Sequence, residues 1–261
     1  MKNKGVFKRV EMKYILNEFQ YRALRKDLEG LAEVDQYGET PILNIYYDTP
    51  DFHLVRMSLD KPLYKEKLRL RSYGTPDDNR NSFIEIKKKF QGVVYKRRVA
   101  MPYTDAVSYL EGDDRDAIRA RQIWTPVDRQ ISREIDSFMG HYQTLAPRMV
   151  VSYDRIAMFG VNDPELRITF DKNLRWRTDD LDLRHGGYGT ALLLPDQYLM
   201  EIKIMGAMPV QLARSLSSLK IFSSSFSKYG SGYRTWFFQQ SAQLAAKMLL
   251  RQVQTDYANA G

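Results

Sequence analysis

Alternating basic residues between positions 65 and 101 constrain the fold of this chain more than any other feature. Successive side chains of a β-strand point to opposite faces, so residues two apart share a face. In the stretch 65–71, Leu68 and Leu70 fall on one face. The other face is basic and consists of Lys65, Lys67, Arg69 and Arg71. We therefore expect a strand that is apolar on one side and cationic on the other.

Two further stretches, 83–89 and 93–100, repeat this alternation and predict the next strands of an antiparallel hairpin pair. Their polar faces carry Glu85, Lys87, Lys89, Lys96 and Arg98. Like charges that face each other across a sheet destabilise it. Two explanations remain open at this point: a solvated face whose lysines favour solubility, or the inside of a groove or barrel that holds a polyanion.

The overall charge favours an anionic partner. The chain has 261 residues, a formal net charge of +8 and a pI of about 9.4, which suits nucleic acid, a phosphate compound or an anionic membrane surface. It contains no cysteine, its first residues are charged rather than apolar, and its apolar runs are short. These features predict no disulfides, no signal peptide and no membrane span, and they fit a cytoplasmic protein.

The periodicity predicts an α+β fold with about eight strands and no linker, so residues 1–261 are expected to form a single domain. Besides the three basic strands, strands are expected at 6–16, 42–47, 149–159, 166–171 and 198–204. Helices are expected at 17–29, within 104–145, at 210–219 and, as a final amphipathic helix, at 233–253. Asn17 with Gln20 predicts a capping box. The stretches 178–189 and 223–232 are expected to be loops.

Several common sites are not supported by the sequence. The histidines, His53, His141 and His185, are not spaced as metal ligands. The chain contains neither the glycine-rich P-loop sequence nor the dinucleotide-binding sequence of Rossmann folds. Metal and phosphate chemistry must therefore come from other residues.

A Glu-x-Lys sequence recurs inside three predicted strands, beginning at Glu11, Glu85 and Glu201. In each strand it places an acid and a base on one face, roughly 6–7 Å apart. So many charges are too costly for a dry barrel core. They suit a hydrated lumen that binds phosphates through Lys and Arg and a divalent metal ion through Glu.

The ordered set of such motifs resembles the VTC domain, the polyphosphate polymerase module of the triphosphate tunnel metalloenzyme superfamily, which is related to the CYTH domains. The motifs begin at Arg9, Lys67, Glu85, Lys96, Tyr153, Arg167, Glu201 and Ser227. The resemblance covers nearly the whole chain. It implies an eight-stranded antiparallel β-barrel that forms a tunnel with flanking helices. It also implies transfer of the γ-phosphate of ATP to a growing polyphosphate chain with Mn²⁺ or Mg²⁺.

The resemblance also implies roles for individual residues. Glu201 would hold the metal ion, although pairing with Lys203 is the structural alternative. The implied catalytic residues are Lys13, Arg69, Arg71 and Lys228. The implied phosphate-binding residues are Lys13, Lys67, Arg69, Arg71, Lys87, Lys96, Arg98, Arg155, Arg167, Lys203 and Lys228. The partners would be ATP and inorganic polyphosphate or triphosphate, and a separate membrane partner protein is compatible with the family. DNA is not expected.

One departure separates this chain from the CYTH pattern Glu-x-Glu-x-Lys, because Arg9 replaces the first acid. This favours polymerase over hydrolase. Two alternatives stay open: a tripolyphosphate or nucleoside-triphosphate hydrolase with the same fold, and a non-catalytic module that binds polyphosphate or RNA. The second is suggested by aromatic residues interleaved with basic ones, namely Tyr64, Tyr73, Phe83, Phe90 and Tyr95.

Overall fold

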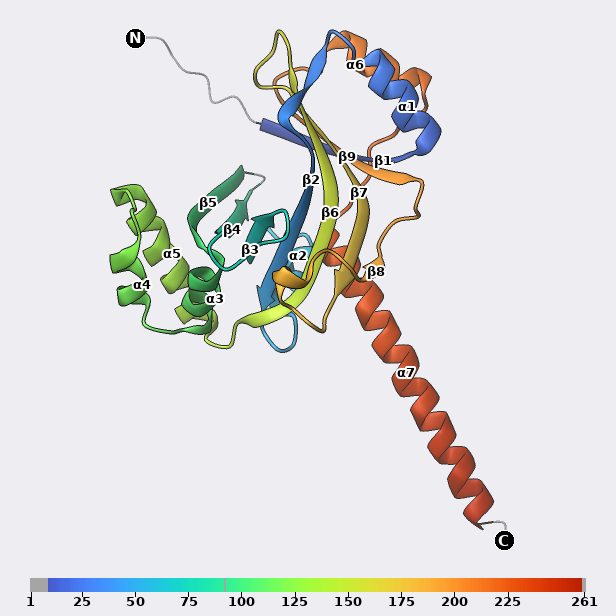
Figure 1. The fold of residues 1–261 in the computed structure, drawn as a ribbon. Coiled ribbons are helices and arrows are strands. Elements are labelled where there is room, and N and C mark those ends of the chain that lie inside the picture. Colours follow the sequence, from blue (N-terminus) through green and yellow to red (C-terminus); the bar gives the residue numbers. More distant parts are fainter. Residues whose placement is uncertain (1–8, 92, 260–261) are drawn as a thin grey trace.

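The computed structural model describes residues 9–91 and 93–259, and a large antiparallel sheet organises them (Figure 1). The strands follow the order β1-β9-β7-β6-β2-β3-β4-β5, and β8 pairs with β7. Their bounds are β1 Arg9–Asn17, β2 Ala32–Asp48, β3 Tyr64–Tyr73, β4 Asn81–Phe90, β5 Val93–Pro102, β6 Ala146–Gly160, β7 Arg167–Arg177, β8 Thr190–Ala191 and β9 Gln197–Met205. The three basic strands of the sequence pattern are β3, β4 and β5.

Helices lie between β1 and β2, between β2 and β3, between β5 and β6, and after β9. Their bounds are α1 Glu18–Asp27, α2 His53–Leu59, α3 Tyr103–Glu111, α4 Arg115–Arg121, α5 Pro126–Tyr142, α6 Val210–Ser218 and α7 Lys228–Asn259. A short 3-10 helix, η1, spans Leu183–His185. The predicted capping box at the start of α1 is present, with Asn17 and Gln20 bonded to each other's backbone. Within the described part of the chain, no helix has both the length and the apolar character needed to cross a membrane.

The closed barrel that was predicted does not form, and this part of the fold prediction was wrong. Over the described residues, no hydrogen-bonded ladder joins the two end strands, β1 and β5. The free edge of β1 is instead occupied by the segment before α7: Tyr14 bridges Ser223, and Ser224 donates its N–H to the Lys13 carbonyl at 2.7 Å. Because this segment occupies the edge of β1, β5 cannot form a backbone ladder with β1 at these positions.

The outer face of the sheet is apolar and covered by helices. Helices α3, α4 and α5 pack on the half formed by β3–β5, where Leu68, Leu70, Ile84 and Ile86 are buried. Helices α1 and α6 cover the half that contains β1, β9 and β7. Burying such side chains stabilises the fold by about 1.5–3 kcal/mol each. The helices therefore force the charged residues of the same strands onto the inner face.

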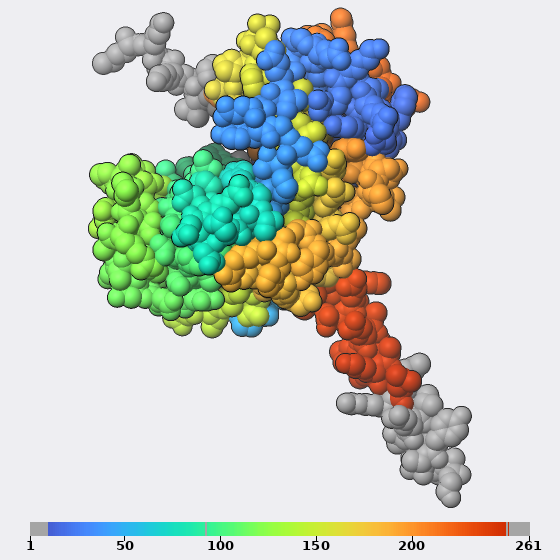
Figure 2. Space-filling view, in the orientation of Figure 1, coloured from blue at the N-terminus to red at the C-terminus, as the bar shows by residue number. Residues whose placement is uncertain are grey.

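One end of the inner face is also apolar, because α2 and the start of α7 pack against it. Tyr46, Phe52, Trp176, Tyr229 and Tyr233 belong to this cluster. After these contacts α7 leaves the body as a projecting rod (Figures 1 and 2). It begins at Lys228, not at residue 233, so the expected loop over 223–232 is helical in its second half. The remainder of the inner face carries the charged residues.

Candidate functional site

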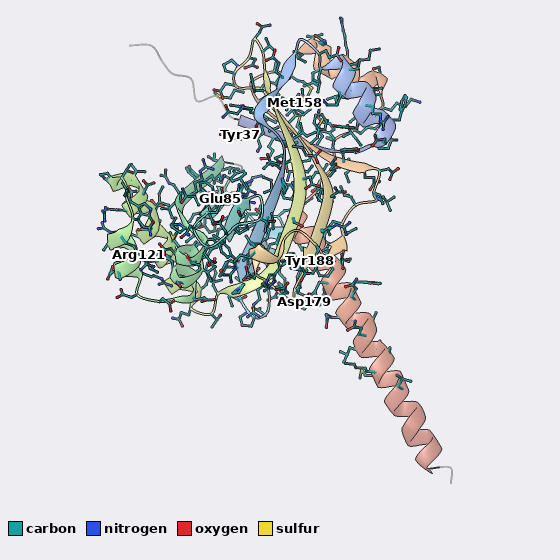
Figure 3. The ribbon with its side chains drawn as sticks, viewed as in Figure 1. Tyr37, Glu85, Arg121, Met158, Asp179 and Tyr188 are labelled. Atoms are coloured by element: carbon teal, nitrogen blue, oxygen red, sulfur yellow. The ribbon has the colours of Figure 1, made fainter. Side chains whose placement is uncertain are left out.

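A first cluster of charges lies on β3, β4 and β5. Glu85 is buried and accepts from Arg69, with Oε2 2.8 Å from Nε and 2.6 Å from Nη2. Its Oε1 lies 2.7 Å from Lys96 Nζ, and Arg71 Nη1 lies 3.8 Å from Oε2. Burial would raise the pKa of Glu85, but these cations outweigh it and lower the pKa to about 2. Figure 3 marks Glu85 on β4. One carboxylate thus aligns three cations.

A second cluster joins β6, β7, β9 and the first turn of α7. Asp171 is fully buried and accepts two hydrogen bonds from Arg155, at 2.6 and 2.8 Å. Lys228 Nζ lies 2.7 Å from Asp171 and 2.9 Å from Glu201. Burial opposes ionisation of Asp171, yet Lys228 and Arg155 lower its pKa. The pKa of Glu201 is lowered as well, against the effect of burial, by Lys228 and Lys13.

A third cluster lies where β1 pairs with β9. Lys13 is 3.5 Å from Glu11 and 3.7 Å from Glu201. Lys203 is 3.9 Å from each of the same two carboxylates. Lys87, from β4, also lies 3.9 Å from Glu11. The last contact joins β1 to β4 through side chains, at the open side of the sheet where the described residues form no ladder between β1 and β5.

Tyr153 connects the first cluster with the second. Its hydroxyl accepts from Arg71 at 3.1 Å, and Arg71 also donates to Asn44 at 2.8 Å. Lys228 Nζ lies 4.7 Å from the centre of the Tyr153 ring, and the guanidinium of Arg155 lies 5.1 Å from it. Burial would raise the pKa of Tyr153, but Arg71 and Arg155 lower it. Cations from β3, β6 and the first turn of α7 therefore approach one tyrosine side chain.

The first turn of α7 is held in place on both sides of Lys228. Tyr229 donates to the buried carboxylate of Asp48 at 2.8 Å and stacks on Tyr46 with ring centres 4.3 Å apart. Ser227 Oγ lies 3.4 Å from Lys67 Nζ. Asp48 in turn accepts the N–H groups of the first turn of α2. Lys228 is thus a rigid part of the site.

Most predicted site residues lie together, and two lie apart. The cations that share the inner face and approach its carboxylates or Ser227 are Lys13, Lys67, Arg69, Arg71, Lys87, Lys96, Arg155, Lys203 and Lys228. Arg98 and Arg167 have the same strand parity but are exposed, over the rings of Phe83 and Phe159 respectively. Their pairing in the sheet puts them next to Glu85 and Lys203.

The sequence prediction assigned no role to several residues that shape this site. Strand parity places Asp171 on the same face as Arg167 and could have identified it, but it was not counted as a site residue. Tyr229 was part of the motif that begins at Ser227 but was assigned no role, and Asn44 and Asp48 gave no signal in the sequence. Their contacts depend on strands or helices that are distant in sequence, and neither periodicity nor spacing reports such contacts.

The carboxylates fit a divalent ion that binds together with a phosphate substrate. Within residues 9–91 and 93–259, no three acidic, histidine or cysteine side chains converge as a metal site. Glu201 and Glu11 nevertheless lie close enough to share Lys13 and Lys203. Thr169 Oγ1, on the strand position paired with Glu201, is buried without a hydrogen-bond partner in the described structure. Mg²⁺ commonly uses one or two carboxylates plus substrate phosphates.

Such an inner face can hold a linear polyanion and neutralise charge that develops on it. Cationic side chains outnumber carboxylates, and they come from strands on both halves of the sheet. The carboxylates fix the guanidinium and ammonium groups in place, so little reorganisation is needed when a phosphate enters. Arginine pairs are well suited to tetrahedral oxyanions.

Comparison with known proteins agrees with this geometry. The family model described as the VTC domain matches residues 8–237. No curated protein matches the chain at a significant level.

The chain also aligns with solved structures at 15% sequence identity. A Hippeastrum protein of similar fold is reported as a candidate adenylyl cyclase with a dominant triphosphatase activity; the alignment covers 87% of this chain and 96% of that chain, with a TM-score of 0.50. A Vibrio parahaemolyticus protein is reported as a candidate adenylate cyclase; the alignment covers 85% of this chain and 96% of that chain, with a TM-score of 0.42.

Proposed function

The chain belongs to the VTC domain family, and on that premise we propose that it is a polyphosphate polymerase. It transfers the γ-phosphate of ATP to the end of an inorganic polyphosphate chain that lies along the inner face of the sheet. The observation that carries the proposal is the convergence of Arg71 of β3 and Lys228 of α7 on Tyr153 of β6. A row of phosphates along this face would be neutralised by cations from the strands and from the helix.

The reaction needs positioning and charge neutralisation more than covalent help from the protein. A terminal polyphosphate oxygen attacks the γ-phosphorus and forms the new P–O bond. The bond between the γ-phosphorus and the β–γ bridging oxygen breaks, and ADP leaves with that electron pair. No net proton transfer occurs. In this proposal Lys13, Arg69, Arg71 and Lys228 contact the transferred group. Each is already held in place by a carboxylate, a carbonyl or a hydroxyl of the site.

The remaining inner-face cations bind the rest of the phosphate chain. They extend from Lys67 of β3 and Lys87 of β4 to Arg155 of β6 and Lys203 of β9. Glu201, with Glu11 and the unpartnered Thr169 hydroxyl nearby, would hold Mn²⁺ or Mg²⁺. When bound, such an ion offsets negative charge on phosphate oxygens.

The pairing of the site's carboxylates with cations favours transfer to phosphate over transfer to water. Glu85 and Asp171 each bind two or more cations at short distance, and a carboxylate with a lowered pKa is a weak general base. An anionic phosphate acceptor needs no base, whereas water benefits from one.

Hydrolysis of a triphosphate is a second candidate, which a solved structure of similar fold suggests. The reported triphosphatase activity of the Hippeastrum protein is compatible with the same fold.

One experiment separates the candidates. The pure protein is incubated with ATP and Mn²⁺, the products are separated on a polyphosphate gel, and free phosphate is measured in parallel. The polymerase predicts a ladder of chains that lengthens with time and little free phosphate. Stoichiometric free phosphate without a ladder would assign the protein as a hydrolase. Binding of polyphosphate without turnover would leave only the non-catalytic module.

A further inference from the structure

The aromatic residues interleaved with the basic ones separate onto two faces of the sheet. Tyr64, Phe90 and Tyr95 share the parity of buried Glu66 and lie on the outer face. Phe83 pairs with Arg71 across β3 and β4, and Tyr73 follows Arg71 by two positions, so both lie on the inner face. Only these two aromatic residues of the set continue the row of phosphate-binding candidates.

Tyr73 and Phe83 form a corner with Arg98 at the end of that row. The Tyr73 and Phe83 rings meet edge to face, with centres 5.5 Å apart and an interplanar angle of 85°. The guanidinium carbon of Arg98 lies 4.9 Å from the centre of the Phe83 ring. A planar guanidinium on an aromatic face leaves its second face available for another flat group.

The corner is only partly explained by packing. Tyr73 is 37% exposed and Arg98 is exposed, whereas Arg71, two positions before Tyr73 on β3, is buried. In the described chain, no carboxylate lies within ion-pair distance of Arg98. An exposed cation and an exposed aromatic ring, both in contact with the half-buried Phe83, therefore lie beside the buried Arg71 and Glu85.

We infer that Tyr73, Phe83 and Arg98 form a subsite that stacks the nucleobase of a nucleoside triphosphate while its phosphates bind along β3. This rests on the proposed function and names the part of the donor that the phosphate site does not contact. Arg98 thereby acts on the base rather than on a phosphate. Stacking tolerates any base, because every base has a π-face, so the subsite separates nucleotides from inorganic phosphates and not one nucleotide from another.

The test compares two ligands that differ in the base. Affinities of the full chain for a non-hydrolysable ATP analogue and for inorganic tripolyphosphate are measured by calorimetry, in wild type, Tyr73→Ala and Tyr73→Phe. Loss of the stacked ring should weaken the nucleotide roughly 5- to 30-fold and leave tripolyphosphate within about twofold. Tyr73→Phe should restore nucleotide affinity. Tyr95→Ala is the matched control, since Tyr95 is an exposed aromatic residue of the same sheet on the outer face.

The outcomes separate this inference from the function on which it rests. Equal weakening of both ligands would overturn the inference and make Tyr73 part of the phosphate site. Equal affinity of wild type for both ligands, with no effect of Tyr73→Ala, would also overturn it while the phosphate site stands. Absence of binding for either ligand in wild type would refute the proposed function and the inference together.

Discussion

Lys228 of α7 lies 2.7 Å from Asp171 of β7, and both side chains are removed from solvent. The contact ties the first turn of the C-terminal helix to the middle of the sheet. Asp171 also holds Arg155 through two hydrogen bonds, so a single carboxylate orients cations from a strand and from a helix. Removing one partner of a buried ion pair costs about 3–5 kcal/mol, because the other charge stays buried.

Asp171→Asn should therefore lower both stability and activity. We expect a loss of about 3 kcal/mol or more in the free energy of unfolding and a large fall in kcat, since Arg155 and Lys228 lose their alignment. Urea unfolding curves and steady-state kinetics measure the two effects. Asp154→Asn is the control: Asp154 is on the neighbouring strand, and among the described residues its side chain accepts a hydrogen bond from Asn173 alone. A stable, fully active Asp171→Asn variant would contradict this account.

Binding of triphosphate should weaken as the pH rises through about 8. Burial lowers the pKa of Lys67 and of Lys96 to about 8, and a bound polyanion favours their charged forms. Affinity should fall by up to about tenfold per pH unit for each lysine that loses its proton. Calorimetry with tripolyphosphate from about pH 7 to about pH 10 tests this. Lys67→Arg stays charged over this range, so it should reduce the dependence of affinity on pH. An unchanged dependence would show that deprotonation of Lys67 does not weaken binding.

The same lysines affect folding in the opposite sense. Their pKa values in the folded protein lie below the ordinary value of 10.5, so the unfolded chain binds more protons between about pH 8 and pH 10.5. The free energy of unfolding should gain a positive contribution from these lysines across that interval. Comparing wild type with Lys67→Met by urea unfolding at both ends of the interval isolates the contribution.

The residues of the inner face were largely predictable from the sequence. Whether the sheet closes into a barrel was not. Strand parity alone placed Arg69, Lys87 and Glu201 on the charged face, because the apolar residues between them had to meet the covering helices. The missing ladder between β1 and β5 depends on Ser223 and Ser224, which come to β1 from far along the chain. The sequence around β1 and β5 therefore does not indicate that another segment occupies the edge of β1.

The start of α7 illustrates a second limit. Its glycines, Gly230 and Gly232, indicated a loop, since glycine disfavours helix interiors. In the structure both lie where α7 packs tightly. A Cβ atom on Gly230 would lie 2.8 Å from Leu59 Cδ2, and one on Gly232 would lie 2.6 Å from Met149 Sδ. The glycines thus serve close packing on α2 and β6, which brings Lys228 into the site.

The conformation of the loop between β7 and β8, and with it the stability of the protein, should depend on Arg177. This buried side chain donates to the carbonyls of Asp180, Asp182, Gly186 and Tyr188; Figure 3 marks Tyr188 and Asp179 beside β8. Arg177→Lys cannot keep this set of bonds, and about 2–4 kcal/mol of stability should be lost at about 1 kcal/mol per bond. Thermal melting measures the loss, and phosphate affinity should be unaffected. Arg175→Lys, which removes one exposed bond, should change stability little.

Glu201→Gln tests the metal assignment. In the structure Glu201 is almost buried and approaches Lys228, Lys13 and Lys203. Gln keeps the shape and can still accept a hydrogen bond from Lys228, so the variant should fold, with a lower melting temperature. Removing a negative charge from this basic face should leave metal-free triphosphate binding equal or tighter. Turnover with Mn²⁺ should nevertheless fall by at least about a hundredfold, because charge stabilisation by the ion is worth several kcal/mol.

Glu11→Gln is the matched comparison for this test, because Glu11 contacts the same two lysines, Lys13 and Lys203, and is more exposed. If Glu201 is the principal ligand, Glu11→Gln should retain most turnover while Glu201→Gln loses it across a full Mn²⁺ titration. If both variants lose turnover alike, the two carboxylates hold the ion together. A folded Glu201→Gln variant that turns over like wild type at every Mn²⁺ concentration would show that Glu201 only positions Lys228 and Lys13, and that the ion, if required, binds through the phosphates.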